Sequence, residues 1–119
     1  MTGKRDPAAA LPLTPAVFHV LLTLAEGDQH GYAIMKAVAA RTDGAVRLST
    51  GTLYGMVKRL LADGIIVESR QRPAAVDDDE RRRYYRLTEF GRQVARAEAE
   101  RLADLVAAAR AMRLLGGKA

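Results

Sequence analysis

Between residues 14 and 27, apolar side chains recur three or four positions apart, which is the spacing of one face of a helix. Thr14 and Pro15 are suited to capping and starting a helix, and Gly27 is suited to ending it. The pattern therefore predicts a first helix between them. Apolar residues recur in the same way over residues 30–42, which predicts a second helix.

A third helix is predicted between Ser49, a favourable N-cap, and Gly64, a favourable stop. Beyond it lie a β-branched run at residues 65–67, a polar stretch at 71–80 and the alternating sequence RRRYYRL at 81–87. Two such runs joined by a polar segment are typical of a β-hairpin with a long tip.

The last predicted element is a long helix, which Thr88 caps and which extends from Glu89 to about Met112. A short extended segment at residues 46–48 could precede the third helix. The element order is α-α-α-β-β-α, mainly α with a small β-hairpin. This order predicts a winged helix-turn-helix, in which the third helix enters the major groove of DNA and the hairpin lies along the backbone.

The same pattern divides the chain into four parts. Residues 1–12 contain two prolines and no apolar period, so we expect a flexible N-terminal arm. Residues 13–88 would form the winged helix-turn-helix DNA-binding domain, and residues 89–113 a C-terminal dimerisation helix. Residues 114–119 would form a flexible tail.

Composition narrows the functional class. With 119 residues, 49% of them hydrophobic and 28% charged, the chain is expected to form one globular domain that is too small for a large enzyme. The absence of cysteine excludes disulfides and thiolate metal sites. The formal charge of +5 favours a polyanionic partner.

Neither catalysis nor membrane attachment is expected. The two histidines, His19 and His30, lie in no sequence context that suggests catalysis, and we expect no metal and no cofactor. Residues 7–25 carry no charge, but Pro12 and Pro15 interrupt them, and a membrane-spanning helix needs about 20 apolar residues. We therefore expect a cytoplasmic protein.

The predicted third helix has a small, cationic face opposite its apolar face. At about 100° per residue, the apolar side comprises Leu53, Val57, Leu60 and Leu61. The opposite side comprises Gly51, Thr52, Gly55, Lys58 and Arg59. Gly55 would let the helix axis approach a groove floor, and Arg59 could then reach a base edge or a phosphate. An ordinary solvated amphipathic helix would carry similar charges, so this face alone does not decide between the two interpretations.

The predicted hairpin is rich in arginine, a residue that can neutralise DNA phosphates. Its arginines are Arg70, Arg72, Arg81, Arg82, Arg83 and Arg86. The acidic cluster at residues 77–80 could pair with these arginines, repel DNA or hold a hard cation. A solvated loop tip is favoured, because four consecutive acids lack the alternating spacing of a calcium loop.

The final helix carries two apolar stripes. Phe90, Val94 and Ala97 are suited to packing on the chain's own domain. The second stripe has no partner within the chain, and we predict that it packs against the same helix of a second subunit. Its members are Leu102, Leu105, Val106, Ala109 and Met112. The alternative is that this stripe folds back onto the first helix.

Three segments resemble the PadR family of bacterial transcriptional regulators. They are HGYAIMKAV at 30–38, STGTLYGMVKRLLADGII at 49–66 and RRYYRLTEFGR at 82–92, and the resemblance extends over about residues 13–110. It implies a homodimer that binds double-stranded DNA at an inverted repeat, usually as a repressor. It also implies that a small aromatic or cationic ligand sometimes releases the protein from DNA. Many members have proline after the recognition-helix tyrosine, where this chain has Gly55.

The resemblance also assigns DNA contacts. It places Tyr32 and Tyr54 among them, although a tyrosine at the position of Tyr54 could equally belong to the core with its hydroxyl at the surface. The complete predicted set is Tyr32, Ser49, Thr50, Gly51, Thr52, Tyr54, Gly55, Lys58, Arg59, Arg70, Arg72, Arg81, Arg82 and Arg83.

Two questions stay open at this point. A winged helix can also bind protein or RNA, and salt-sensitive binding without sequence preference would favour that alternative. A pocket for a small-molecule effector could form at the dimer interface, or that interface could be filled. The residues that could line such a pocket are Val17, Leu21, Leu102 and Leu105.

Overall fold

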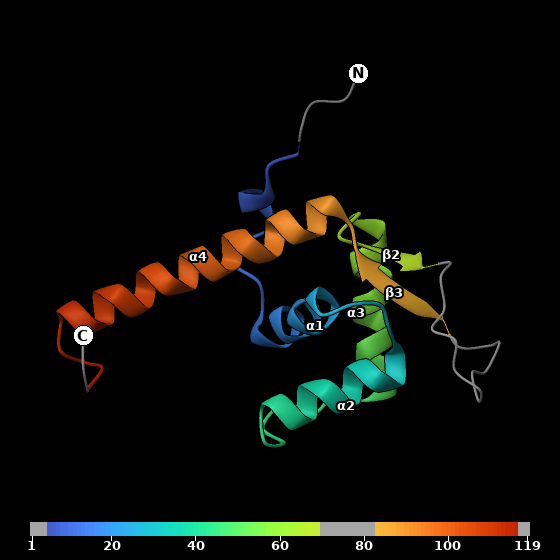
Figure 1. The fold of residues 1–119 in the computed structure, drawn as a ribbon, viewed down its shortest axis with the longest axis horizontal. Coiled ribbons are helices and arrows are strands. Elements are labelled where there is room, and N and C mark those ends of the chain that lie inside the picture. Colours follow the sequence, from blue (N-terminus) through green and yellow to red (C-terminus); the bar gives the residue numbers. More distant parts are fainter. Residues whose placement is uncertain (1–4, 70–82, 117–119) are drawn as a thin grey trace.

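The structure is a computed structural model that describes residues 5–69 and 83–116. Its elements are η1 (Pro7–Ala10), α1 (Pro15–Ala25), β1 (Gln29–His30), α2 (Gly31–Arg41), α3 (Thr50–Ala62), β2 (Ile66–Ser69), β3 (Tyr84–Leu87) and α4 (Glu89–Ala111). The first three α-helices and the strands gather beside the N-terminal half of α4, whose C-terminal half extends away from them (Figure 1). The predicted fold class, mainly α with a small hairpin, is confirmed.

Each of the four α-helices begins at a side chain that caps it. Thr14 Oγ1 accepts a hydrogen bond from the backbone N–H of Val17 at 3.1 Å, and Ser49 Oγ accepts one from Thr52 at the same distance. Thr88 Oγ1 caps α4 in the same way. For α2 the cap is a histidine, since His30 Nδ1 accepts from the N–H of Ala33 at 3.2 Å. Local chemistry therefore fixes where each helix begins.

The sheet has three strands in the order β1-β3-β2, with both pairs antiparallel. The sequence suggested an extra strand at residues 46–48, and this suggestion is wrong. The third strand is instead Gln29–His30, which pairs with Tyr84 and Tyr85 of β3. β3 would otherwise present an unpaired edge, and the two residues before α2 satisfy its backbone groups.

The core forms where the apolar faces of the helices meet the sheet, and both adjacent tyrosines of β3 are buried. Tyr85 packs in the core. Tyr84 lies on the other face of the sheet, where its ring meets the His30 ring edge-on at 5.3 Å between centroids. The alternation of the strand therefore buries aromatic side chains on both faces at this point.

The described residues that precede α1 pack more closely than the sequence suggests. Residues 1–12 were expected to form a flexible arm, but within the described part of this range η1 lies against α4, and Leu11 packs on the core. The Arg5 guanidinium lies 4.0 Å from the centre of the Phe90 ring and donates a hydrogen bond to the carbonyl of Asp63. These partners are far away in sequence, so no local pattern could have indicated them.

Glu98 is the largest departure from simple amphipathic packing, because this acid on α4 is only 1% exposed. Its carboxylate accepts hydrogen bonds from Arg101 Nε at 2.7 Å, Arg101 Nη2 at 2.9 Å and the backbone N–H of Leu13 at 3.3 Å. The hydrogen-bonded guanidinium of Arg101 holds the pKa of Glu98 below its usual range. The interaction between Glu98 and Arg101 therefore stabilises the folded protein at a pH above the ordinary carboxyl pKa. This contribution is lost as the pH falls through the lowered pKa of Glu98.

α4 is attached to the rest of the domain by a very close contact at Gly91. A Cβ atom at this position would overlap the carbonyl oxygen of Ile65 and lie 3.0 Å from its carbonyl carbon. Next to it, the Thr88 hydroxyl donates to the carbonyl of Gly64 at 2.6 Å. The first turn of α4 therefore lies directly on the turn between α3 and β2.

Gly91→Ala is expected to lower the free energy of unfolding by at least about 2 kcal/mol, because the methyl group would meet a backbone carbonyl that cannot move without displacing β2. Thermal and urea unfolding, followed by circular dichroism, would measure the loss. Gly55→Ala is the matched control, since nothing lies within 4 Å of a Cβ there. A Gly91→Ala protein as stable as the wild type would contradict the steric argument.

Candidate nucleic-acid interface

One face of α3 is built into the core and the other faces solvent. Leu53, Val57 and Leu60 are buried, as predicted. Leu61 was predicted to join them, but it is 38% exposed. It lies near the end of α3, on the flank of the buried row, where the core does not extend to it.

The exposed face of α3 contains small and cationic side chains and no acid. The exposed predicted contacts on α3 are Thr50, Gly51, Thr52, Tyr54, Gly55, Lys58 and Arg59. Within the described residues, neither Lys58 nor Arg59 forms an ion pair. Ser49 differs from the rest, because its hydroxyl both caps α3 and bonds to Thr52 Oγ1 at 2.9 Å. The Ser49 hydroxyl is therefore already engaged in capping the start of α3.

Two tyrosines mark the place where α2 and α3 meet. Tyr32 is 58% exposed and Tyr54 is 44% exposed, so neither belongs to the core. The ring of Tyr54 packs on Gly31, where a Cβ atom would overlap its hydroxyl and lie 2.8 Å from Cζ. Glycine at the first position of α2 thus lets the Tyr54 hydroxyl lie beside the start of that helix, one residue from Tyr32.

Of the predicted hairpin contacts, only Arg83 lies within the described residues. It is exposed and pairs with Glu68 on the adjacent strand at 3.2 Å. The other predicted contacts, Arg70, Arg72, Arg81 and Arg82, lie outside the described residues, as does the acidic cluster at 77–80. Arg86 pairs with Asp28 at 3.1 Å.

Two cations near Tyr32 were not among the predicted contacts. Lys36 follows Tyr32 by one helical turn and its Nζ lies 5.4 Å from the centre of the Tyr32 ring. Arg47 lies just before α3. The two border a hollow of about 190 Å³ lined by Tyr32, Met35, Lys36, Ala39, Arg47 and Leu48. The i, i+4 spacing of Tyr32 and Lys36 could have indicated the first of these residues.

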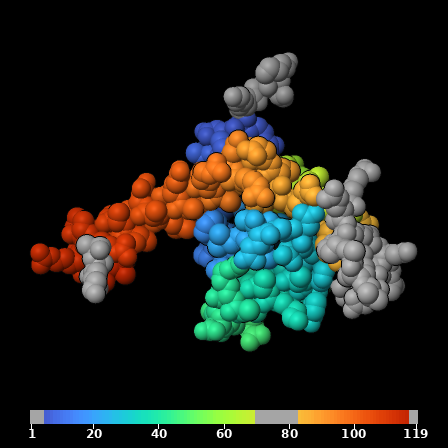
Figure 2. Space-filling model, viewed as in Figure 1, coloured from blue at the N-terminus to red at the C-terminus, as the bar shows by residue number. Residues whose placement is uncertain are grey.

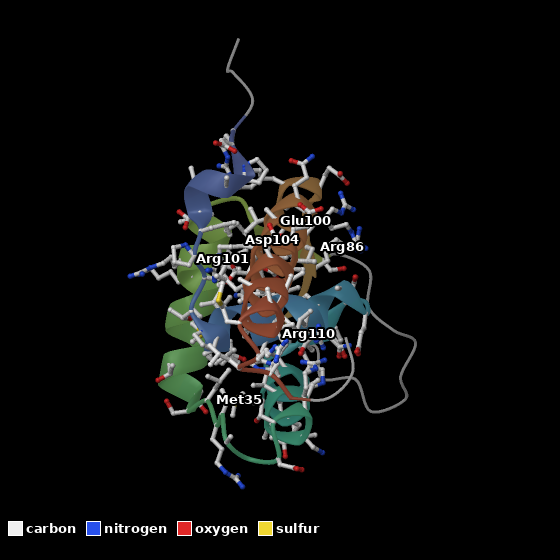
Figure 3. The ribbon with its side chains drawn as sticks, turned by 90° about the vertical axis from the view of Figure 1, so that its left-hand side faces the viewer. Met35, Arg86, Glu100, Arg101, Asp104 and Arg110 are labelled. Carbon is white, nitrogen blue, oxygen red and sulfur yellow. The ribbon has the colours of Figure 1, made fainter. Side chains whose placement is uncertain are left out.

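The C-terminal half of α4 projects beyond the body of the domain (Figures 1 and 2). Leu105 is 55% exposed, Val106 40% and Met112 71%, while Leu102 and Ala109 are partly covered. The alternative in which this stripe folds back onto α1 is therefore not observed. Figure 3 views the molecule from this end and shows Arg101, Asp104 and Arg110 along α4.

Two of the residues suggested to line an effector pocket at a dimer interface differ in their exposure. Leu21 is fully buried in the core, whereas Leu105 is exposed on the projecting half of α4. Over residues 5–69 and 83–116, no group of three or more histidine, aspartate or glutamate side chains is arranged to hold a metal ion. No helix in these ranges is long and apolar enough to cross a membrane.

Comparison with protein-family models matches residues 20–97 to the transcriptional regulator PadR-like family. The chain is 35% identical over 100 residues to "Transcriptional regulator Rv3488" of Mycobacterium tuberculosis, covering 84% of this chain and 82% of that protein. It is also 37% identical over 86 residues to an uncharacterized 37.1 kDa protein in transposon TN4556 of Streptomyces fradiae. That match covers 72% of this chain but only 22% of the Streptomyces protein.

Solved structures share the fold. A transcriptional regulator from Clostridium thermocellum is 27% identical, with a TM-score of 0.66 over 80% of this chain and 86% of that one. Bacillus subtilis PadR, solved in complex with operator DNA, is 21% identical, with a TM-score of 0.58 over 72% of this chain and 47% of that one.

Proposed function

The chain belongs to the PadR-like family of transcriptional regulators, and we propose that it binds a specific DNA sequence as a homodimer. The assignment confirms the family that the sequence motifs indicated, and it confirms that the chain is not an enzyme, because members of this family are transcriptional regulators. We further propose that it acts in the cytoplasm, represses a promoter by occupying an inverted repeat there, and is released by a small-molecule effector.

The observation that carries the proposal is the exposed face of α3. Its glycines and threonines leave the first half of the helix narrow, so its backbone can approach the floor of a major groove. Lys58 and Arg59 follow on the second half, exposed and without a carboxylate partner among the described residues. A face with small residues, two available cations and no acid suits a polyanionic groove better than it suits an apolar protein surface.

Neighbouring elements support the same partner. One hydroxyl and two cations lie beside α3, the proposed recognition helix, where they would meet the DNA backbone. They belong to Tyr32, Lys36 and Arg47. We propose that Arg83 and the hairpin residues Arg70, Arg72, Arg81 and Arg82 add further phosphate contacts. The Bacillus subtilis protein whose fold this chain shares was solved on operator DNA.

The projecting half of α4 supports the homodimer. Its exposed leucine, valine and methionine side chains continue the helix face that packs on the domain in the first half, and a second copy would remove them from water. Two copies related by a two-fold axis present two recognition helices. Half-sites about 34–36 Å apart in an inverted repeat would fit them.

The proposal is tested by fluorescence anisotropy with DNA from the gene's own upstream region and with a scrambled duplex, across a salt series. We expect about a thousandfold tighter binding to the upstream duplex at physiological salt, with one dimer per site. Equal, salt-sensitive binding to both duplexes would contradict sequence-specific recognition and favour a nonspecific or RNA-binding role. No binding to either duplex would favour a protein partner.

Two variants separate the roles of the α3 cations in the same assay. Arg59→Ala should cost about 1–3 kcal/mol on the upstream duplex and little on the scrambled one, because a base contact is lost. Lys58→Ala should weaken binding to both duplexes and reduce the salt slope by about one, because a phosphate contact is lost. Equal losses from both variants on both duplexes would show that Arg59 contacts phosphate and not a base.

Gly55→Ala should change stability and binding in opposite directions. The methyl group meets nothing within 4 Å, and alanine is about 1 kcal/mol more favourable than glycine inside a helix, so the protein should become more stable. In the complex the same methyl group would hold α3 away from the groove floor, and we expect affinity for the upstream duplex to fall about tenfold. A stabilised variant with unchanged affinity would exclude Gly55 from the interface.

Leu105→Asp should weaken both dimerisation and DNA binding, because it places a charge on the apolar face of the projecting half of α4. Sedimentation at micromolar concentration and anisotropy would measure the two effects. Ala107→Asp introduces the same acid on the opposite side of α4 and should leave the dimer intact. A Leu105→Asp protein that remains dimeric and binds normally would contradict this interface.

A further inference from the structure

Asp28 lies where the three strands of the sheet meet. It directly precedes β1, and its Oδ2 accepts a hydrogen bond from the hydroxyl of Ser69, the last residue of β2. The same oxygen accepts one from Arg86 Nη2 of β3 at 3.1 Å. A single carboxylate therefore joins the segment that enters α2 to both strands of the hairpin.

This connection strengthens the weakest part of the sheet. β1 is only two residues long and pairs with β3 at Gln29 and His30 alone. Besides these pairs, side chains on one face of the sheet hold β1 in place: the ring contact of His30 with Tyr84, and the hydrogen bonds of Asp28. The start of α2 follows β1 without a linker, so the position of Tyr32 depends on this attachment.

The charge of Asp28 is unexpected at a surface proposed to bind phosphates. Partial burial opposes ionisation, but hydrogen bonds from Ser69 and Arg86 outweigh it and hold the pKa of Asp28 below its usual range. The residue is therefore an anion at neutral pH. Since an anion near DNA repels the backbone, its presence suggests a role within the protein that offsets this repulsion.

We propose that Asp28 is a positioning residue for DNA binding, which holds the hairpin and the start of α2 in the relative orientation that lets both contact one duplex. The proposal rests on the proposed function. Arg86 takes part as a donor to Asp28 and not as a phosphate contact, whereas Tyr32 and Arg83 lie on the two segments that Asp28 connects. Loss of Asp28 would let the segments move independently and separate their phosphate contacts.

The sign of the effect distinguishes this role from simple electrostatics. Removing an acid raises the net charge by one and by itself strengthens binding to DNA. A positioning role predicts the reverse for Asp28→Ala: about tenfold weaker binding to the upstream duplex and a shallower salt slope, because fewer phosphates are contacted together. Glu68→Ala is the matched control, since Glu68 is an acid of the same hairpin, paired with Arg83, and its removal should leave binding equal or tighter.

Binding is measured by anisotropy across a salt series at a temperature where circular dichroism shows each variant folded. Asp28→Asn keeps the size of the side chain and should show a smaller loss in the same direction, which covers the case in which Asp28→Ala does not fold. Folded Asp28 variants that bind as tightly as the wild type, or more weakly with an unchanged salt slope, would overturn the proposal. A wild-type protein that binds neither duplex would instead overturn the proposed function and this inference with it.

Discussion

The contact between Gly91 and the carbonyl of Ile65 is the constraint on which the rest of the architecture depends. No side chain fits between the two backbones, and the Thr88 hydroxyl ties the same place to Gly64. The first turn of α4 is consequently fixed on the turn that ends α3. Since backbone meets backbone, the direction of α4 relative to α3 cannot adjust by a change of rotamer.

A second contact fixes the rotation of α4 about its own axis. Glu98 lies two turns beyond Gly91, and its carboxylate must face both Arg101 and the backbone N–H of Leu13. A buried pair of this kind is weak evidence for stability, because desolvation offsets much of the attraction. It does specify orientation: apolar residues tolerate a small rotation of the helix, whereas a hydrogen-bonded carboxylate loses its partners.

The sequence predicted what local chemistry determines. All four helix caps accept a hydrogen bond from an N–H three residues ahead. Three of them, Thr14, Ser49 and Thr88, are of the residue types that favour this position, so they are recognisable without knowledge of the fold. The outward residues of α3 follow in the same way from helical periodicity. Both features require only the spacing of neighbouring residues.

Contacts between distant residues could not be predicted in this way. Leu13 and Glu98 are 85 residues apart, and Asp28 is 41 residues from Ser69 and 58 from Arg86. Glu98 and Asp28 resemble ordinary surface acids in the sequence, and only the fold buries one and surrounds the other with donors. The strand suggested at residues 46–48 failed for the same reason, because the partner of β3 is chosen by the tertiary arrangement and not by local β-propensity.

These constraints together explain how α4 can pack on its own domain and also on the second copy in the proposed dimer. The face of α4 that carries Val94 and Glu98 against its own domain continues, without a change of helical phase, into Leu105 and Met112 beyond it. Isolated helices shorter than about 12–15 residues are marginal in water, so the projecting half gains its rigidity from the anchored half and, in the proposed dimer, would gain more from the second copy. With α3 fixed to the anchored end, the angle between two such α4 helices would set the distance between the recognition helices, and with it the spacing of the half-sites.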